Sequence, residues 1–228
     1  MKTNQINPLV DCFSCLLSKQ PLPTELKSIV DRIQSEERLA ILTAEYRRLI
    51  AGQDKEATKD FMLTSIPALA PCGRFLGGKA RKDLVSLTGL CLLDLDDLSE
   101  EEYDRVLAVV KGDNHTVLAS RSISGHGLHV LIHYTLVDKQ GQPAIHGSEP
   151  KRLSRIYTSV WKTSCQYVRS RIPVFAIEEV ALNAERLILI GADPDVYYNP
   201  EASPLPVIYR YVRDAKLSRH PAFTIYEP

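Results

Sequence analysis

A buried strand that ends in two acidic residues constrains this chain most. Residues 90–93 are apolar, as expected of a strand inside a fold, and Asp94-Leu95-Asp96 follows directly. Side chains two positions apart on a strand point to the same face, so we expect Asp94 and Asp96 to project together. Neighbouring carboxylates repel unless a positive charge lies between them, and Mg²⁺ and Mn²⁺ prefer oxygen ligands. The pattern predicts a divalent metal site; the alternative is that these acids only end the strand and begin the next helix.

Composition indicates the class of protein without naming its partner. The 228 residues suffice for one large domain or for a domain plus an extension, and 44% hydrophobic and 25% charged residues are typical of a globular protein. Because 28 basic residues balance 28 acidic ones, bulk charge gives no argument for nucleic-acid binding. Without a long apolar run or a secretory signal, we expect no membrane partner. The odd number of cysteines, five, favours the reducing cytoplasm.

The N-terminal segment, residues 1–65, is predicted to be helical after a short candidate strand over residues 9–13. Its apolar residues recur three and four positions apart, which is the spacing of amphipathic helices that pack on another element. Thr24 is the expected N-cap of the first helix, and Gly52 is the expected end of the second. The predicted helices cover residues 25–34, 36–50 and 55–64.

A loop or hairpin rich in glycine and proline follows over residues 67–82, and it is locally basic. Its cations are Arg74, Lys79, Arg81 and Lys82. One interpretation is an arm that contacts nucleic-acid phosphates just before the acidic strand. The other interpretation is a solvated turn.

After this loop, the predicted elements follow the order β-α-β-β-α-β. The acidic strand leads into a helix that begins with a capping box of Ser99 and Glu102. This βαββαβ order is typical of the ferredoxin-like, RRM-type α+β fold, whose sheet has helices on one face and leaves the other free for a site. We expect this core over residues 66–200, and a C-terminal tail or linker to a following domain over residues 201–228. The later elements are expected over residues 116–120 (strand), 128–134 (strand), 151–171 (helix), 174–178 (strand) and 186–190 (strand).

The turn of the predicted hairpin carries groups that could bind an anion. Residues 121–129 read R-S-I-S-G-H-G-L-H. Gly125 and Gly127 would let backbone N–H groups approach a phosphate closely, with Ser124 between the strands. Arg121 and His129 flank the turn and could hold phosphate.

A third acid is expected beside the first two. Glu178 ends the strand after the second helix, with Glu179 as the alternative. In a βαββαβ sheet the last strand lies beside the first, so Glu178 can lie near Asp94 and Asp96.

Three acids beside a glycine-rich turn are typical of two-metal phosphoryl transfer. One ion lowers the pKa of an attacking 3′-hydroxyl and the other neutralises the triphosphate, the ions lying about 3.5–4 Å apart. In this interpretation Asp94, Asp96 and Glu178 hold Mg²⁺ or Mn²⁺. The nucleotide-binding residues would be Arg121, Ser124, Gly125, Gly127 and His129.

The motif series resembles the archaeo-eukaryotic primase superfamily, the prim-pol enzymes. Leu92-Leu93-Asp94-Leu95-Asp96 is similar to its first motif, and S-G-H-G-L-H-V at residues 124–130 is similar to its second. The wider chain, over roughly residues 55–200, resembles the VirE amino-terminal-type primase domain of bacterial mobile elements. The stretches that carry this wider resemblance are I-P-A at 66–68, G-R-F at 73–75, R-L-I-L at 186–189, D-P-D-V-Y at 193–197 and Asn199.

The resemblance implies a DNA primase/polymerase-type nucleotidyltransferase that works on a DNA template with nucleoside triphosphates. It also implies a role in mobile-element replication beside a helicase domain or protein. Arg186 is expected to support the site through a salt bridge with an acidic ligand. Two alternatives stay open: a catalytically inactive DNA-binding module with the same fold, and a metal-dependent nuclease or phosphodiesterase that uses water as the nucleophile.

Overall fold

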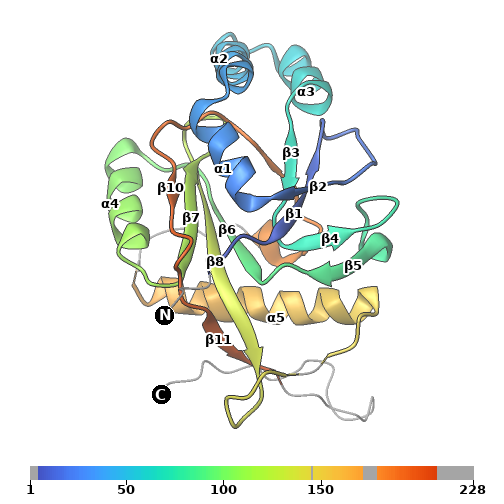
Figure 1. The fold of residues 1–228 in the computed structure, drawn as a ribbon. Helices are drawn as coiled ribbons and strands as arrows, with labels where there is room; N and C mark the ends of the chain where they lie inside the picture. Colours follow the sequence, from blue (N-terminus) through green and yellow to red (C-terminus); the bar gives the residue numbers. More distant parts are fainter. Residues whose placement is uncertain (1–4, 145, 172–178, 210–228) are drawn as a thin grey trace.

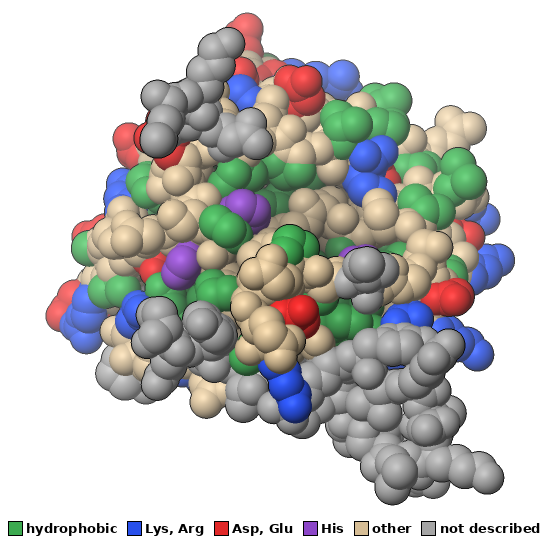
Figure 2. Space-filling view, turned by 60° about the horizontal axis from the view of Figure 1, so that its bottom comes forward, with side chains coloured by type: hydrophobic (Ala, Val, Ile, Leu, Met, Phe, Trp, Pro, Cys, Tyr) green, Lys and Arg blue, Asp and Glu red, His purple; other side chains and the backbone are tan. Residues whose placement is uncertain are grey.

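The computed structural model describes residues 5–144, 146–171 and 179–209, and it confirms a mixed α+β fold with antiparallel sheets (Figure 1). Within these residues no helix is both long and apolar enough to cross a membrane. On the face seen in Figure 2, basic and acidic side chains are both scattered rather than gathered by sign. This view therefore agrees with the balanced composition.

The central sheet contains the predicted acidic strand and the predicted hairpin. Strand β8 lies between β6 and β7 and is antiparallel to both, which is the arrangement expected for the first three strands of a ferredoxin-like core. The end of β8 pairs in parallel with β11, and β10 pairs with β7. The strand predicted over residues 174–178 lies outside the described residues. The strands are β6 (Leu90–Leu95), β7 (Thr116–Arg121), β8 (Leu128–Val137), β10 (Tyr197–Tyr198) and β11 (Leu205–Ile208).

Two helices pack on this sheet for reasons that are visible in the sequence. Helix α4 (Glu100–Lys111) begins with the predicted capping box, in which Ser99 Oγ accepts a hydrogen bond from the Glu102 N–H. Helix α5 (Pro150–Arg169) begins with proline at its first position, where no backbone N–H is needed. Its buried Tyr157 hydroxyl accepts a hydrogen bond from the backbone N–H of Leu92, which fixes α5 against β6.

A second sheet has the strand order β2-β1-β3-β9 and joins the N-terminal segment to the rest of the chain. Strand β1 pairs with β3 across the predicted boundary at residue 65, and the predicted strand at residues 186–190 appears here as β9. A separate hairpin pairs β4 with β5, and the segment between the two strands, which includes η1, carries much of the basic loop. The elements are β1 (Leu9–Phe13), β2 (Leu22–Glu25), β3 (Ala68–Ala70), β4 (Gly73–Phe75), η1 (Arg81–Asp83), β5 (Leu84–Leu87), η2 (Glu179–Leu182) and β9 (Ile188–Leu189).

The three predicted N-terminal helices are present as α1 (Leu26–Ser35), α2 (Glu37–Ala51) and α3 (Lys55–Thr64). The predicted N-cap of the first one is wrong. Thr24 lies in strand β2 opposite Val10, and its hydroxyl donates a hydrogen bond to the Leu22 carbonyl instead of capping a helix. Pairing between β1 and β2 holds Thr24 in the sheet, so α1 begins at Leu26, one residue later than expected.

Candidate functional site

The first and second sequence motifs meet on one face of the central sheet. Asp94 on β6 lies directly opposite His129 on β8, and His129 lies opposite Ser120 on β7. Directly opposite residues in an antiparallel sheet share a face. His129 Nε2 lies 3.3 Å from Asp94 Oδ1, and both side chains are buried. The pairing register therefore brings together two residues that are 35 positions apart in the sequence.

This face opens into a pocket of about 650 Å³. Five of the predicted site residues line it: Asp94, Asp96, Ser124, His129 and Arg186. The other lining residues are Leu16, Tyr46, Met62, Ser122, Ile123, Asn183, Glu185, Leu187, Ile188 and Leu189.

Arg186 supplies positive charge at the buried acid. Its Nη2 lies 3.2 Å from Asp94 Oδ2, so the salt bridge expected of Arg186 is present. The Asp94 side chain is only 3% exposed, and its Oδ1 has no hydrogen-bond partner among the described residues. A buried acceptor in that state at a pocket wall can accept a ligand.

The buried imidazole of His129 is held in its neutral form. Burial lowers the pKa of His129, and Arg186 lowers it further, against the opposing effect of Asp94. A neutral imidazole can either donate or accept a hydrogen bond at the pocket.

The turn between β7 and β8 lies against the end of the acidic strand. Gly125 has a φ of +92°, a conformation that glycine adopts without strain. A Cβ placed on Gly127 would lie 2.7 Å from Asp96 Oδ1 and 2.7 Å from the Leu95 carbonyl oxygen. Glycine at this position therefore lets the turn approach the end of the acidic strand. The approach of its backbone N–H groups to a phosphate stays a prediction.

Arg121 does not line the pocket. Its side chain lies on the α4 side of the sheet, where Nη1 donates to Glu100 Oε1 at 2.9 Å and the guanidinium lies 3.6 Å from the Tyr103 ring centroid. Side chains alternate along a strand, so Arg121, next to Ser120, points away from His129. Arg121 Nη1 also donates to the Gly125 carbonyl oxygen at 3.0 Å, so it holds the turn from the far side.

The four cations of the basic loop are divided between internal contacts and solvent. Arg74 pairs with a fully buried carboxylate, and Lys82 is exposed. The internal partners are Asp11 for Arg74 at 2.8 Å, the Leu16 carbonyl and the Phe13 ring for Lys79, and Glu185 for Arg81 at 3.1 Å. Three of the four therefore contribute to the fold, whatever else they contact.

The predicted third acid cannot be placed, because Glu178 lies outside the described residues, as does the side chain of Glu179. No group of three or more His, Cys, Asp or Glu in the described part of the chain is arranged to hold a metal. Sequence reasoning missed Glu185, which lines the pocket and has a buried Oε2 without a hydrogen-bond partner among the described residues. The signal in the sequence that could have indicated Glu185 is its position directly before Arg186, which was expected at the site.

The described carboxylates are compatible with a hard divalent cation. Mg²⁺ is commonly held by one or two carboxylates, its remaining positions taken by water and substrate phosphate. Asp94 and Asp96 line one pocket, and Asp94 presents a buried oxygen without a hydrogen-bond partner in the described chain. These two side chains fit the requirement without a third ligand.

Comparison with protein-family models matches residues 62–198 to the family described as BT4734-like, N-terminal domain. The comparison with curated proteins found no match, and neither did the comparison with solved structures. The matched segment contains both acids, the glycine turn and Arg186, and it spans more than half of the chain. The chain therefore belongs to the BT4734-like N-terminal domain family.

Proposed function

We propose that this domain is a DNA primase/polymerase-type nucleotidyltransferase, which extends a 3′-hydroxyl on a DNA template with nucleoside triphosphates. The observation that carries the proposal is the pairing of Asp94 with His129 at a pocket that also contains Asp96 and Ser124. The resemblance of these motifs to prim-pol enzymes adds to it.

In the proposed reaction, the 3′-hydroxyl oxygen forms a bond to the α-phosphorus of the bound nucleotide. The bond from that phosphorus to the bridging oxygen of pyrophosphate breaks, and the hydroxyl proton passes to solvent. Mg²⁺ or Mn²⁺, held by Asp94 and Asp96 with Glu178 as a further ligand, would supply charge neutralisation and a lowered hydroxyl pKa.

The protein groups would bind and orient the triphosphate. Ser124 and the backbone at Gly125 and Gly127 lie on the turn beside Asp96, and neutral His129 can donate to a phosphate oxygen. Arg186 is 37% exposed at the same pocket, so its guanidinium can contact phosphate while it balances Asp94. Arg121 would position the turn instead of binding the nucleotide.

The wider setting is proposed from the resemblance alone. We propose that the domain works in the cytoplasm beside a helicase domain or protein, in replication of a mobile element.

A primer-synthesis assay tests the proposal, with labelled nucleotides, single-stranded DNA and either Mg²⁺ or Mn²⁺. We expect labelled oligonucleotides from the wild type, and none from Asp94→Asn or Asp96→Asn. Asp97→Asn is the matched control, because Asp97 is exposed and outside the pocket lining, and asparagine also accepts its positive φ.

Two other results would overturn the proposal. Shortening of the template by the wild type would indicate a nuclease. Binding of single-stranded DNA without product under either metal would indicate a non-catalytic module.

A further inference from the structure

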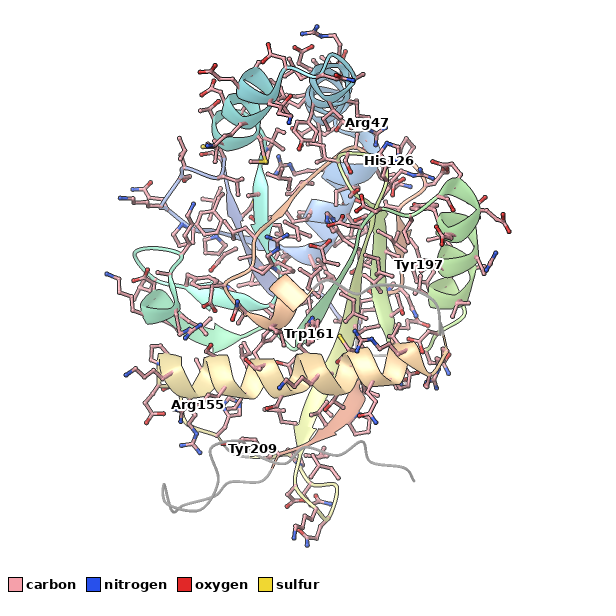
Figure 3. The ribbon with its side chains drawn as sticks, turned by 180° about the vertical axis from the view of Figure 1, so that it is seen from behind. Arg47, His126, Arg155, Trp161, Tyr197 and Tyr209 are labelled. Atoms are coloured by element: carbon pink, nitrogen blue, oxygen red, sulfur yellow. The ribbon has the colours of Figure 1, made fainter. Side chains whose placement is uncertain are left out.

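Helix α2 contributes one side chain to the lining of the acidic pocket. Tyr46 lines the pocket, and hydrogen bonds fix the helix on either side of it. Thr43 Oγ1 accepts from the Ala192 N–H at 2.8 Å, and Arg47 Nε donates to the Ile123 carbonyl oxygen at 2.9 Å. Figure 3 shows Arg47 near His126, where α2 approaches the β7–β8 turn. Tyr46 is thus held at the pocket by contacts to two separate parts of the core.

The pocket lining combines apolar and charged side chains. Leu16, Met62, Leu187 and Leu189 are apolar and Tyr46 is aromatic, whereas Asp94, Asp96, Glu185 and Arg186 are charged. Ligand sites combine a mostly apolar lining with a few polar groups that fix orientation. A nucleotide likewise combines a planar base with an anionic phosphate chain.

An aromatic side chain is suited to contact that base. Every nucleobase has a π-face, so stacking on an aromatic ring tolerates any base. Burial raises the pKa of Tyr46, so its phenol stays neutral beside an anionic ligand. Helix α2 lies before residue 62, where the family match begins, so the match assigns it no role.

We propose that Tyr46 contacts the base of the nucleotide whose phosphates lie at the acidic part of the pocket, which makes α2 part of the nucleotide site. This inference rests on the proposed function, because it assumes that the pocket binds a nucleoside triphosphate. It adds a base-contacting residue from the N-terminal segment.

Equilibrium binding of ATP and of inorganic triphosphate, each with Mn²⁺, separates base contact from phosphate contact. We expect Tyr46→Leu to weaken ATP binding about ten-fold while triphosphate binding stays unchanged, because leucine keeps apolar bulk but cannot stack. Tyr46→Phe should bind ATP like the wild type. Ile41→Ala is the control, because Ile41 is 62% exposed on the same helix.

The outcomes separate this inference from the proposed function. ATP binding that is unchanged in Tyr46→Leu, or equal weakening of ATP and triphosphate, overturns the base contact alone. A wild type that binds neither ligand overturns both proposals. If Tyr46→Leu fails to fold, NMR contacts between the Tyr46 ring and adenine protons in the wild type decide: their presence supports the contact, and their absence overturns it.

Discussion

Replacing Arg186 with alanine removes the cation that balances a buried carboxylate. Arg186 Nη2 lies 3.2 Å from Asp94 Oδ2, and the Asp94 side chain is only 3% exposed. Breaking a fully buried pair costs about 3–5 kcal/mol, because the remaining charge is left uncompensated. Arg186 is 37% exposed, so solvent screens this pair, and we expect Arg186→Ala to lower the free energy of unfolding by about 1–3 kcal/mol.

The same reasoning predicts that the loss depends on the carboxylate charge. Asp94→Asn keeps the shape of the side chain but removes the charge, so Arg186→Ala should cost less in that background. We expect a coupling free energy of about 1 kcal/mol or more between the two positions. A double-mutant cycle therefore isolates the interaction from the packing of the arginine stem.

A divalent cation should replace the missing guanidinium. An ion that binds only the folded state stabilises it by about 1.4 kcal/mol at ten times its dissociation constant. Mg²⁺ should therefore stabilise Arg186→Ala, and it should not stabilise Asp94→Asn. This comparison tests metal binding without an activity assay.

Urea unfolding followed by circular dichroism measures all these quantities. Millimolar MgCl₂ should be compared with NaCl at equal ionic strength, which removes the effect of screening. The reasoning is refuted if Arg186→Ala is as stable as the wild type, or if it costs as much in the Asp94→Asn background as in the wild type.

Three further predictions test the supports of the pocket. Arg47→Ala frees the β7–β8 turn from α2, so it should weaken nucleotide binding several-fold in the same equilibrium assay; Arg48→Ala should not, because Arg48 pairs with Glu45 on the helix surface. Gly127→Ala places a Cβ 2.7 Å from a backbone oxygen and should destabilise the fold by about 1–3 kcal/mol; an unchanged melting temperature would contradict this. Burial lowers the pKa of His133 from 6.5, so the unfolded chain binds its proton at higher pH than the folded chain. The stability of the fold should therefore fall as the pH drops below about 6.5, because protonation of His133 favours the unfolded chain. In urea titrations across this pH range, His133→Gln should lose less stability than the wild type.

The sequence predicted correctly those helices and caps that depend on interactions between residues close together in the chain. The helix over residues 55–64 and the capping box at Ser99 were predicted correctly, because periodicity and caps involve neighbours in the chain. The N-cap assigned to Thr24 was wrong, because a distant strand pairs with that residue. The propensity of a single residue does not indicate which distant strand will pair with it.

The candidate site was predictable where alternation along a strand determines it. Asp94, Asp96 and His129 share the pocket, as expected from their strand positions. The same alternation, applied to Arg121, would have shown that it points to the helix-covered face. Glu185 and Tyr46 reach the pocket through packing between the two sheets and α2, which no spacing in the sequence reveals.

The strand that carries His129 and the helix that carries Tyr46 are held in the molecule by different numbers of backbone hydrogen bonds. Strand β8 is bonded along both edges, so the floor that contains Asp94 and His129 cannot shift without distorting the whole sheet. Helix α2 instead packs on the core through buried Leu39 and Thr43 and makes hydrogen bonds to it through Thr43 and Arg47, without a ladder of backbone hydrogen bonds. We therefore expect helix α2 to move when the pocket binds ligands of different size, while Asp94 and His129 keep a fixed geometry.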